Sequence, residues 1–189
     1  MLLLSAANGN SLKVISILVY GISLVLLFSA SATYHLVNAT DRVMGRLRKL
    51  DHAAIYVLIA GTYTPICLNL FDGTLRWGFL AFIWAFALAG IIVKVFVINA
   101  PRWVTAGIYL VMGWMALFII KPLLASVPLA GLVWMLAGGL LFSIGAVIYI
   151  TRKLDLIPGV FGFHEIWHIF VSLGCLCHFI MIYQYIIKG

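Results

Sequence analysis

The sequence predicts an all-α membrane protein: a polytopic bundle of six transmembrane helices that forms a single domain over residues 1–189. Hydrophobic residues make up 65% of the chain and charged residues only 9%. Soluble proteins are roughly half apolar and about a quarter charged, so a bilayer is the solvent that this composition suits. The apolar residues also run in long unbroken stretches, and they do not alternate with polar residues as the strands of a membrane barrel would.

Each apolar stretch is long enough to cross about 30 Å of hydrocarbon as a helix. The segments between them contain the Pro, Gly, Asn, Asp and basic residues that commonly end helices. The sequence shows no linker, repeat or low-complexity tract, which favours one compact bundle. The expected helices cover 12–36, 50–70, 75–98, 102–120, 127–150 and 164–187.

The net charge of +7 comes mainly from Lys and Arg residues in the short segments between helices. They do not form a broad basic face, so nucleic-acid binding is not expected. Most of them follow the first, third and fifth helices, and the positive-inside rule makes that side cytoplasmic. The sequence therefore predicts a multi-pass protein of the plasma membrane with both ends of this chain outside.

Ionisable residues inside membrane helices are costly and are candidates for function. His35 lies at the end of the first expected helix, Asp51 opens the second, and His164 and His168 open the sixth. Successive helices run in opposite directions, so these positions should all lie at the cytoplasmic level of the bundle.

The spacing of His164 and His168 predicts a metal site. Residues four apart project from the same face of a helix, which allows both rings to bind one ion. With His35 as a third ligand, the set resembles a catalytic zinc site, which keeps one position open for water. Asp51 is placed to hold that water or to orient a ligand, and Ser31 lies one turn before His35.

Each of these residues could instead have a purely structural role. His35 could be a polar residue at the membrane interface, and Ser31 could bond a carbonyl of its own helix. Asp51 could balance the dipole at a helix start. His164 to His168 also matches the H-E-x-x-H motif of zinc metalloproteases, in which Glu165 would be the general base.

The remaining candidates favour packing over function. His178 lies deeper along its helix and is expected to be a hydrogen-bonded core residue, whereas His52 is expected at the interface. Cys67, Cys175 and Cys177 all lie inside apolar stretches, which argues against a disulfide framework.

Three segments in order resemble the hemolysin III branch of the progestin and adipoQ receptor superfamily, which is similar to the alkaline ceramidases. They are SATYH from Ser31, LDHAAIYVLIAGTYTP from Leu50 and FHEIWHIFVSLGCLCHF from Phe163. The resemblance implies a seven-helix bundle with zinc on His35, His164 and His168, water near Asp51, and Ser31 in a supporting role. Family members carry an earlier helix with an E-x2-N-x3-H element, and the sequence contains no such element, so six helices are expected here.

Three functions follow as alternatives. The first is a zinc-dependent hydrolase that cleaves a lipid amide or ester, takes an acyl-chain substrate from the membrane lipids, and serves membrane lipid homeostasis. The second is a non-enzymatic, receptor-like or regulatory membrane protein in which zinc is structural. A pore-forming hemolysin is a weaker third alternative, because a conducting path needs more polar residues along the helices.

Overall fold

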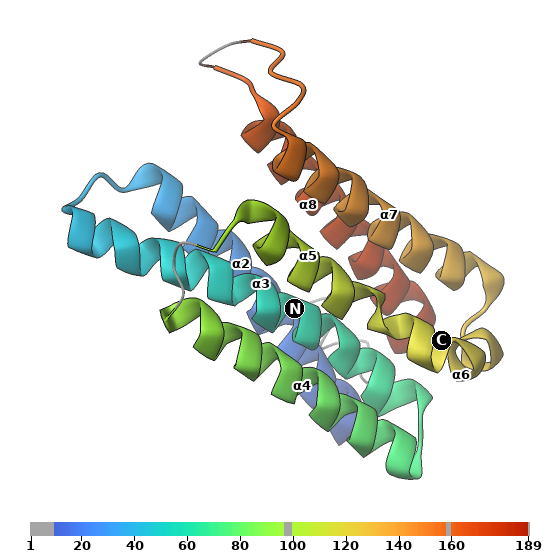
Figure 1. Ribbon diagram of the computed structural model, residues 1–189. Helices are drawn as coiled ribbons and strands as arrows, with labels where there is room; N and C mark the ends of the chain where they lie inside the picture. Colours follow the sequence, from blue (N-terminus) through green and yellow to red (C-terminus); the bar gives the residue numbers. More distant parts are fainter. Residues whose placement is uncertain (1–9, 97–99, 158–159, 189) are drawn as a thin grey trace. The chain divides into compact units, whose positions relative to one another are not determined.

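The computed structural model describes residues 10–96, 100–157 and 160–188. Within that part of the chain, six helices are long and apolar enough to cross a membrane, which confirms the predicted class (Figure 1). The only pairing of β type in the described residues is an isolated bridge between Ile157 and Phe161. The chain forms two compact units, 1–99 and 100–189, and each has its own packing.

The first unit contains α2 (Ser11–Leu36), α3 (Asp41–Leu70) and α4 (Gly73–Phe96), with α3 packed against both neighbours. The Asn10 side chain caps α2 by accepting the backbone N–H groups of Leu12 and Lys13. Close approach of the helices depends on glycine at two points, because a Cβ on Gly61 would overlap the Ser23 side chain and one on Gly90 would overlap the Tyr56 ring. The contact at Gly61 allows α2 and α3 to pack closely, and the contact at Gly90 does the same for α3 and α4.

The start of α3 differs from the prediction. The helix begins at Asp41 rather than near residue 50, so the expected polar connection is helical. Residues 41–50 include Arg, Leu, Lys and Met, which are strong helix formers, and Asp41 provides an acidic residue in the first turn. Asp51 therefore lies about three turns inside the helix instead of opening it.

The second unit begins with α5 (Arg102–Gly113), a 3-10 segment (Trp114–Ile119) and α6 (Ile120–Ser126). The fourth expected helix therefore extends beyond residue 120, where the sequence KPLLASVP had predicted a loop. Pro122 lies in the first turn of α6, where a missing N–H breaks no helical hydrogen bond. The unit continues with α7 (Leu129–Thr151), α8 (Phe163–Ile182) and a π-helical segment (Tyr183–Ile187).

Helices α7 and α8 pack along a row of glycines. Gly131, Gly138 and Gly145 recur every seven residues on α7, and at each of them a Cβ would overlap or crowd a side chain from the C-terminal half of the unit. The ring of His178 fills the space at Gly138, and its Nε2 donates to the Met135 carbonyl oxygen at 3.2 Å. The prediction that His178 is a hydrogen-bonded core residue is confirmed.

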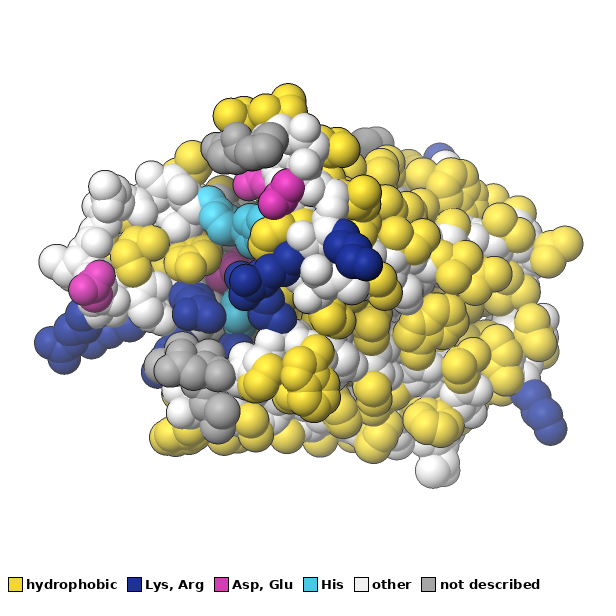
Figure 2. Space-filling model, turned by 45° about the horizontal axis from the view of Figure 1, so that its top comes forward, with side chains coloured by type: hydrophobic (Ala, Val, Ile, Leu, Met, Phe, Trp, Pro, Cys, Tyr) yellow, Lys and Arg dark blue, Asp and Glu magenta, His cyan; other side chains and the backbone are white. Residues whose placement is uncertain are grey.

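Large aliphatic and aromatic side chains are exposed along the long helices other than α3, as the surface of a lipid-embedded protein requires, whereas α3 exposes them only in its first ten residues. Figure 2 shows such side chains over much of the visible surface. All three cysteines are buried and free, which confirms their packing role.

Candidate metal site

The start of α8 is held by two acidic side chains. The Glu165 carboxylate accepts the Gly162 N–H at 2.9 Å, and the Asp155 carboxylate accepts the Phe163 N–H at 3.0 Å. Two of the N–H groups that a helix leaves unpaired at its first turn are thereby satisfied. The backbone that carries His164 is fixed by these bonds.

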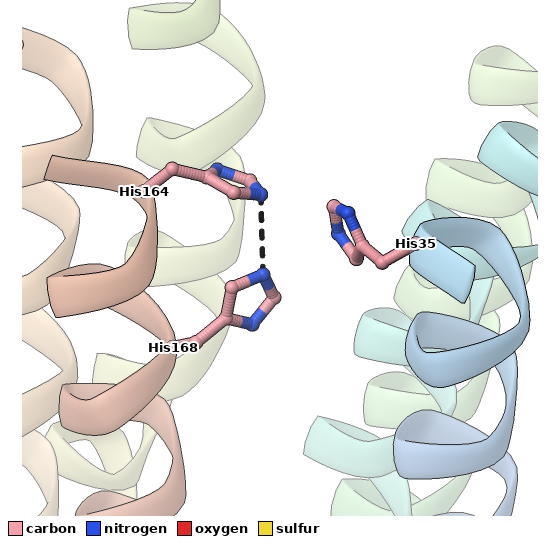
Figure 3. Close-up of side chains that lie close together, drawn as sticks. All are labelled: His35, His164 and His168. Carbon is pink, nitrogen blue, oxygen red and sulfur yellow. Dashed lines mark hydrogen bonds between the residues drawn. The ribbon is translucent and has the colours of Figure 1, made fainter. Parts of the chain in front are cut away.

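His164 and His168 project from one side of α8, one turn apart, and their rings meet edge to face (Figure 3). The two Nε2 atoms lie 3.2 Å apart. Without a metal one nitrogen must donate and the other accept, because a neutral imidazole has one nitrogen of each kind. Zinc–nitrogen bonds of about 2.0–2.1 Å at the tetrahedral angle place two ligand nitrogens about 3.3–3.4 Å apart. The pair thus has nearly the separation that two ligands of one zinc ion need.

Aromatic rings surround this pair. Trp167 lies between the two histidines in sequence, and its ring contacts both of theirs. Tyr149 at the end of α7 contacts Trp167 and His164, and the Arg102 guanidinium lies 5.1 Å above the Tyr149 ring. The surroundings restrict the rotation of the His164 ring and place a cation nearby.

Sequence reasoning missed Tyr149, Trp167 and Arg102 as neighbours of the pair. Tyr149 and Arg102 lie near helix ends, where aromatic and basic residues are routine in membrane proteins. Trp167 could have been found, because it lies three residues after His164 on the same helix.

The first unit brings together Ser31, His35 and Asp51. Asp51 is only 7% exposed, Ser31 donates a hydrogen bond to its carboxylate, and His35 is close enough to interact with its charge. His35 projects from the last turn of α2 (Figure 3). Its ring is edge-on to that of Tyr34. That His35 shares an ion with His164 and His168 stays a prediction.

A buried lysine near the same end of the first unit was not predicted as a candidate. Lys94 in the last turn of α4 is 6% exposed and lies close enough to His52 and Arg48 for their charges to interact. Its position near the end of an apolar helix does not predict burial, which depends on the packing of α4. The environment of His52 is therefore more cationic than its own helix suggests.

Glu165 is exposed, and its carboxylate is engaged with the helix start. A general base must be able to reach water at the metal, and a capping carboxylate is directed towards the backbone instead. The geometry therefore favours a structural role for Glu165 over the role it has in the H-E-x-x-H motif.

Comparison with known proteins identifies the family. The family model described as "Haemolysin-III related" matches residues 1–179. The chain is 37% identical to the Hemolysin-3 homolog of Bacillus subtilis over 188 residues, 99% of this chain and 85% of that protein. It is also 37% identical to Hemolysin-3 of Bacillus cereus over 183 residues, 97% of this chain and 80% of that protein.

A more distant similarity extends to a human protein. The chain is 29% identical to the human monocyte to macrophage differentiation factor over 200 residues, 99% of this chain and 77% of that protein. The matches cover nearly the whole chain, including the three segments that carry its histidines. The chain therefore belongs to the haemolysin-III-related family of multi-pass membrane proteins, as its sequence motifs predicted.

Proposed function

We propose that the protein is a zinc-dependent hydrolase that cleaves an amide or ester bond of a membrane lipid and serves membrane lipid homeostasis. The observation that carries the proposal is the pair of Nε2 atoms on α8, which lie 3.2 Å apart on one side of the helix. Two imidazoles at this separation suit one ion, and imidazole is a preferred zinc ligand. Hydrolysis of an amide or ester needs an activated water molecule, and a zinc ion held by these histidines would supply one at neutral pH by lowering the pKa of its bound water.

His35 is proposed as the third ligand, and connectivity supports this role. Helix α2 ends just after His35, and α8 begins just before His164. If every long helix crosses the membrane, α3, α4, the α5–α6 helix and α7 cross between them, and an even number of crossings returns the chain to the same side. Three histidine ligands would leave a fourth position for water.

Asp51 is proposed to accept the proton of the water molecule, and Ser31 is proposed to orient the Asp51 carboxylate. The Asp51 carboxylate is nearly buried and accepts a hydrogen bond from Ser31, which fixes its orientation. A carboxylate held in this way can position a water molecule and accept its proton. Apolar helix surfaces nearby suit the acyl chain of the substrate, whose carbonyl would be the point of attack.

A regulatory function with structural zinc is the second candidate. The name of the human relative, monocyte to macrophage differentiation factor, describes a cellular process and no reaction. A pore has less support, although two relatives are named hemolysins. A conducting path needs many polar side chains along the helices, and few are buried within the described residues. They are Ser16, Ser23, Asp51, Thr64, Lys94 and Thr105.

Metal content tests the proposal first. Protein purified in detergent should contain close to one zinc per chain by elemental analysis, and His164→Ala/His168→Ala should contain almost none. His52→Ala is the matched control, since it removes a histidine outside the proposed ligand set and should keep the metal. A double variant that retains zinc as the wild type does would refute the site.

Turnover then separates the two candidate functions. Purified protein is assayed for release of fatty acid from a ceramide and from a glycerolipid ester. Asp51→Asn should keep zinc and lose turnover if the protein is a hydrolase. Zinc bound at full content, with neither substrate cleaved by the wild type, would favour the regulatory function.

A further inference from the structure

The loop between α7 and α8 exposes an unusual amount of apolar surface. Four large aliphatic side chains lie in its described residues, 152–157 and 160–162, with exposures of 53% for Leu154, 64% for Leu156, 55% for Ile157 and 74% for Val160. These side chains belong to no membrane-length helix. Clustered apolar surface of this kind usually marks a site of interaction.

Backbone hydrogen bonds join the two described parts of the loop. The Phe161 carbonyl oxygen accepts the N–H groups of Leu156 and Ile157 at 3.1 and 3.0 Å, and the Phe161 N–H returns to the Ile157 carbonyl at 2.9 Å. Asp155 ties the loop to α8 through the Phe163 N–H. The loop projects beyond the ends of α7 and α8 (Figure 1). These bonds join Leu156 and Ile157 to Phe161, and the aliphatic side chains of the described loop remain exposed.

Position and charge indicate what covers these side chains. The loop starts and ends at two helices of membrane length, so the lipid headgroup region lies beside it. Arg152 and Lys153 are exposed at its beginning, where their side chains can reach lipid phosphates. The one acidic side chain of the described loop, Asp155, is engaged with the backbone.

We infer that the α7–α8 loop is a membrane-docking element that inserts Leu154, Leu156, Ile157 and Val160 into the lipid leaflet, with Arg152 and Lys153 on anionic headgroups. Apolar side chains flanked by basic residues are the usual composition of segments that lie in the membrane interface. Docking would hold the start of α8, and with it the backbone of His164, at a constant depth. The inference does not depend on zinc.

Insertion depth can be measured with a fluorescent label. Val160→Cys and, separately, Ile157→Cys are labelled with an environment-sensitive probe, and the protein is placed in phosphatidylcholine vesicles that contain phosphatidylglycerol. The native cysteines are buried, and background labelling is measured on the wild type. Asn38→Cys, in the exposed polar segment between α2 and α3, is the matched control.

The probes at 160 and 157 should emit to the blue of the probe at 38, should be quenched by brominated acyl chains, and should be protected from aqueous iodide. Quenching by iodide and not by brominated lipid would refute insertion, because the loop would then lie in water. Protection from both quenchers would refute it equally, because another protein surface would then cover the loop.

The basic residues are tested in the same assay. Quenching by brominated lipid should increase with the fraction of phosphatidylglycerol, and Arg152→Gln/Lys153→Gln should lose most of that increase. Equal dependence on anionic lipid in the parent and in the double variant would overturn the role of these two residues.

Discussion

Replacement of Gly138 by alanine should destabilise the second unit, although alanine is the better helix former. A Cβ at this position would overlap the His178 ring at Cδ2 and Nε2, and would lie 3.2 Å from the Gly174 carbonyl oxygen. The His178 ring cannot easily move, because it is bonded to the Met135 carbonyl and packed against Phe142. α7 and α8 would therefore have to separate.

The loss of stability in Gly138→Ala is the difference between two opposed effects. Overpacking of a close contact costs about 1–3 kcal/mol. The gain in helix propensity from glycine to alanine offsets about 0.8–1 kcal/mol of that cost. The net loss in the free energy of unfolding should therefore be on the order of 1 kcal/mol, within a range of about 0–2 kcal/mol.

Gly139→Ala is the matched control, because the neighbouring Cβ would meet Trp114 only at 3.7 Å, which is an ordinary contact. This variant should be as stable as the wild type or more stable. Unfolding in mixed micelles of increasing SDS content, followed by circular dichroism, compares the two. Equal stability of Gly138→Ala and Gly139→Ala would refute the reasoning. In Gly138→Ala/His178→Ala the clash disappears, so the two losses should not add.

Three further predictions concern the polar groups. Asp155→Ala should lower the free energy of unfolding by about 0.5–2 kcal/mol, because it removes a hydrogen-bond acceptor at the start of α8. Unfolding in mixed micelles compares it with Asp155→Asn, which keeps an acceptor oxygen. A loss of equal size in both variants would contradict the capping role. Arg102→Gln should lower the free energy of unfolding by about 0.5–1 kcal/mol, because the guanidinium lies over the rings of Tyr149 and Phe163. Arg102→Lys should lose less, and no loss in Arg102→Gln in the same unfolding assay would show that these contacts do not stabilise the protein. Ser31→Ala should keep zinc and lower turnover at least several-fold, because Asp51 loses the hydroxyl that orients it; unchanged turnover in the lipid assay would remove Ser31 from the proposed site.

Much of the fold follows from the sequence, because the properties that define it are local. A stretch of apolar residues long enough to cross a bilayer has few alternatives to a helix, since every backbone N–H and C=O must be paired within the segment. The ends of α2, α4 and α7 lie within two residues of their predicted positions. The same locality explains the pair of His164 and His168, because spacing by four residues places both rings on one helix face whatever the helix packs against.

Some helix boundaries, and the contacts between helices, could be determined only from the tertiary structure. The start of α3 was misplaced because Arg and Lys residues look like a polar connection, yet they form helix readily. The bond from Ser31 to Asp51 depends on how α2 packs against α3, which the close contact of Gly61 with Ser23 permits.

The sequence by itself therefore determined the membrane class, the family and the histidine pair, because composition, motif order and helical spacing are properties of the chain. Only the tertiary structure decided that Gly138 receives His178, that Tyr149 and Trp167 surround His164, and that Lys94 is buried. The physical reason is that a contact between helices depends on their separation and rotation, and these are set by the shapes of all the side chains packed between them.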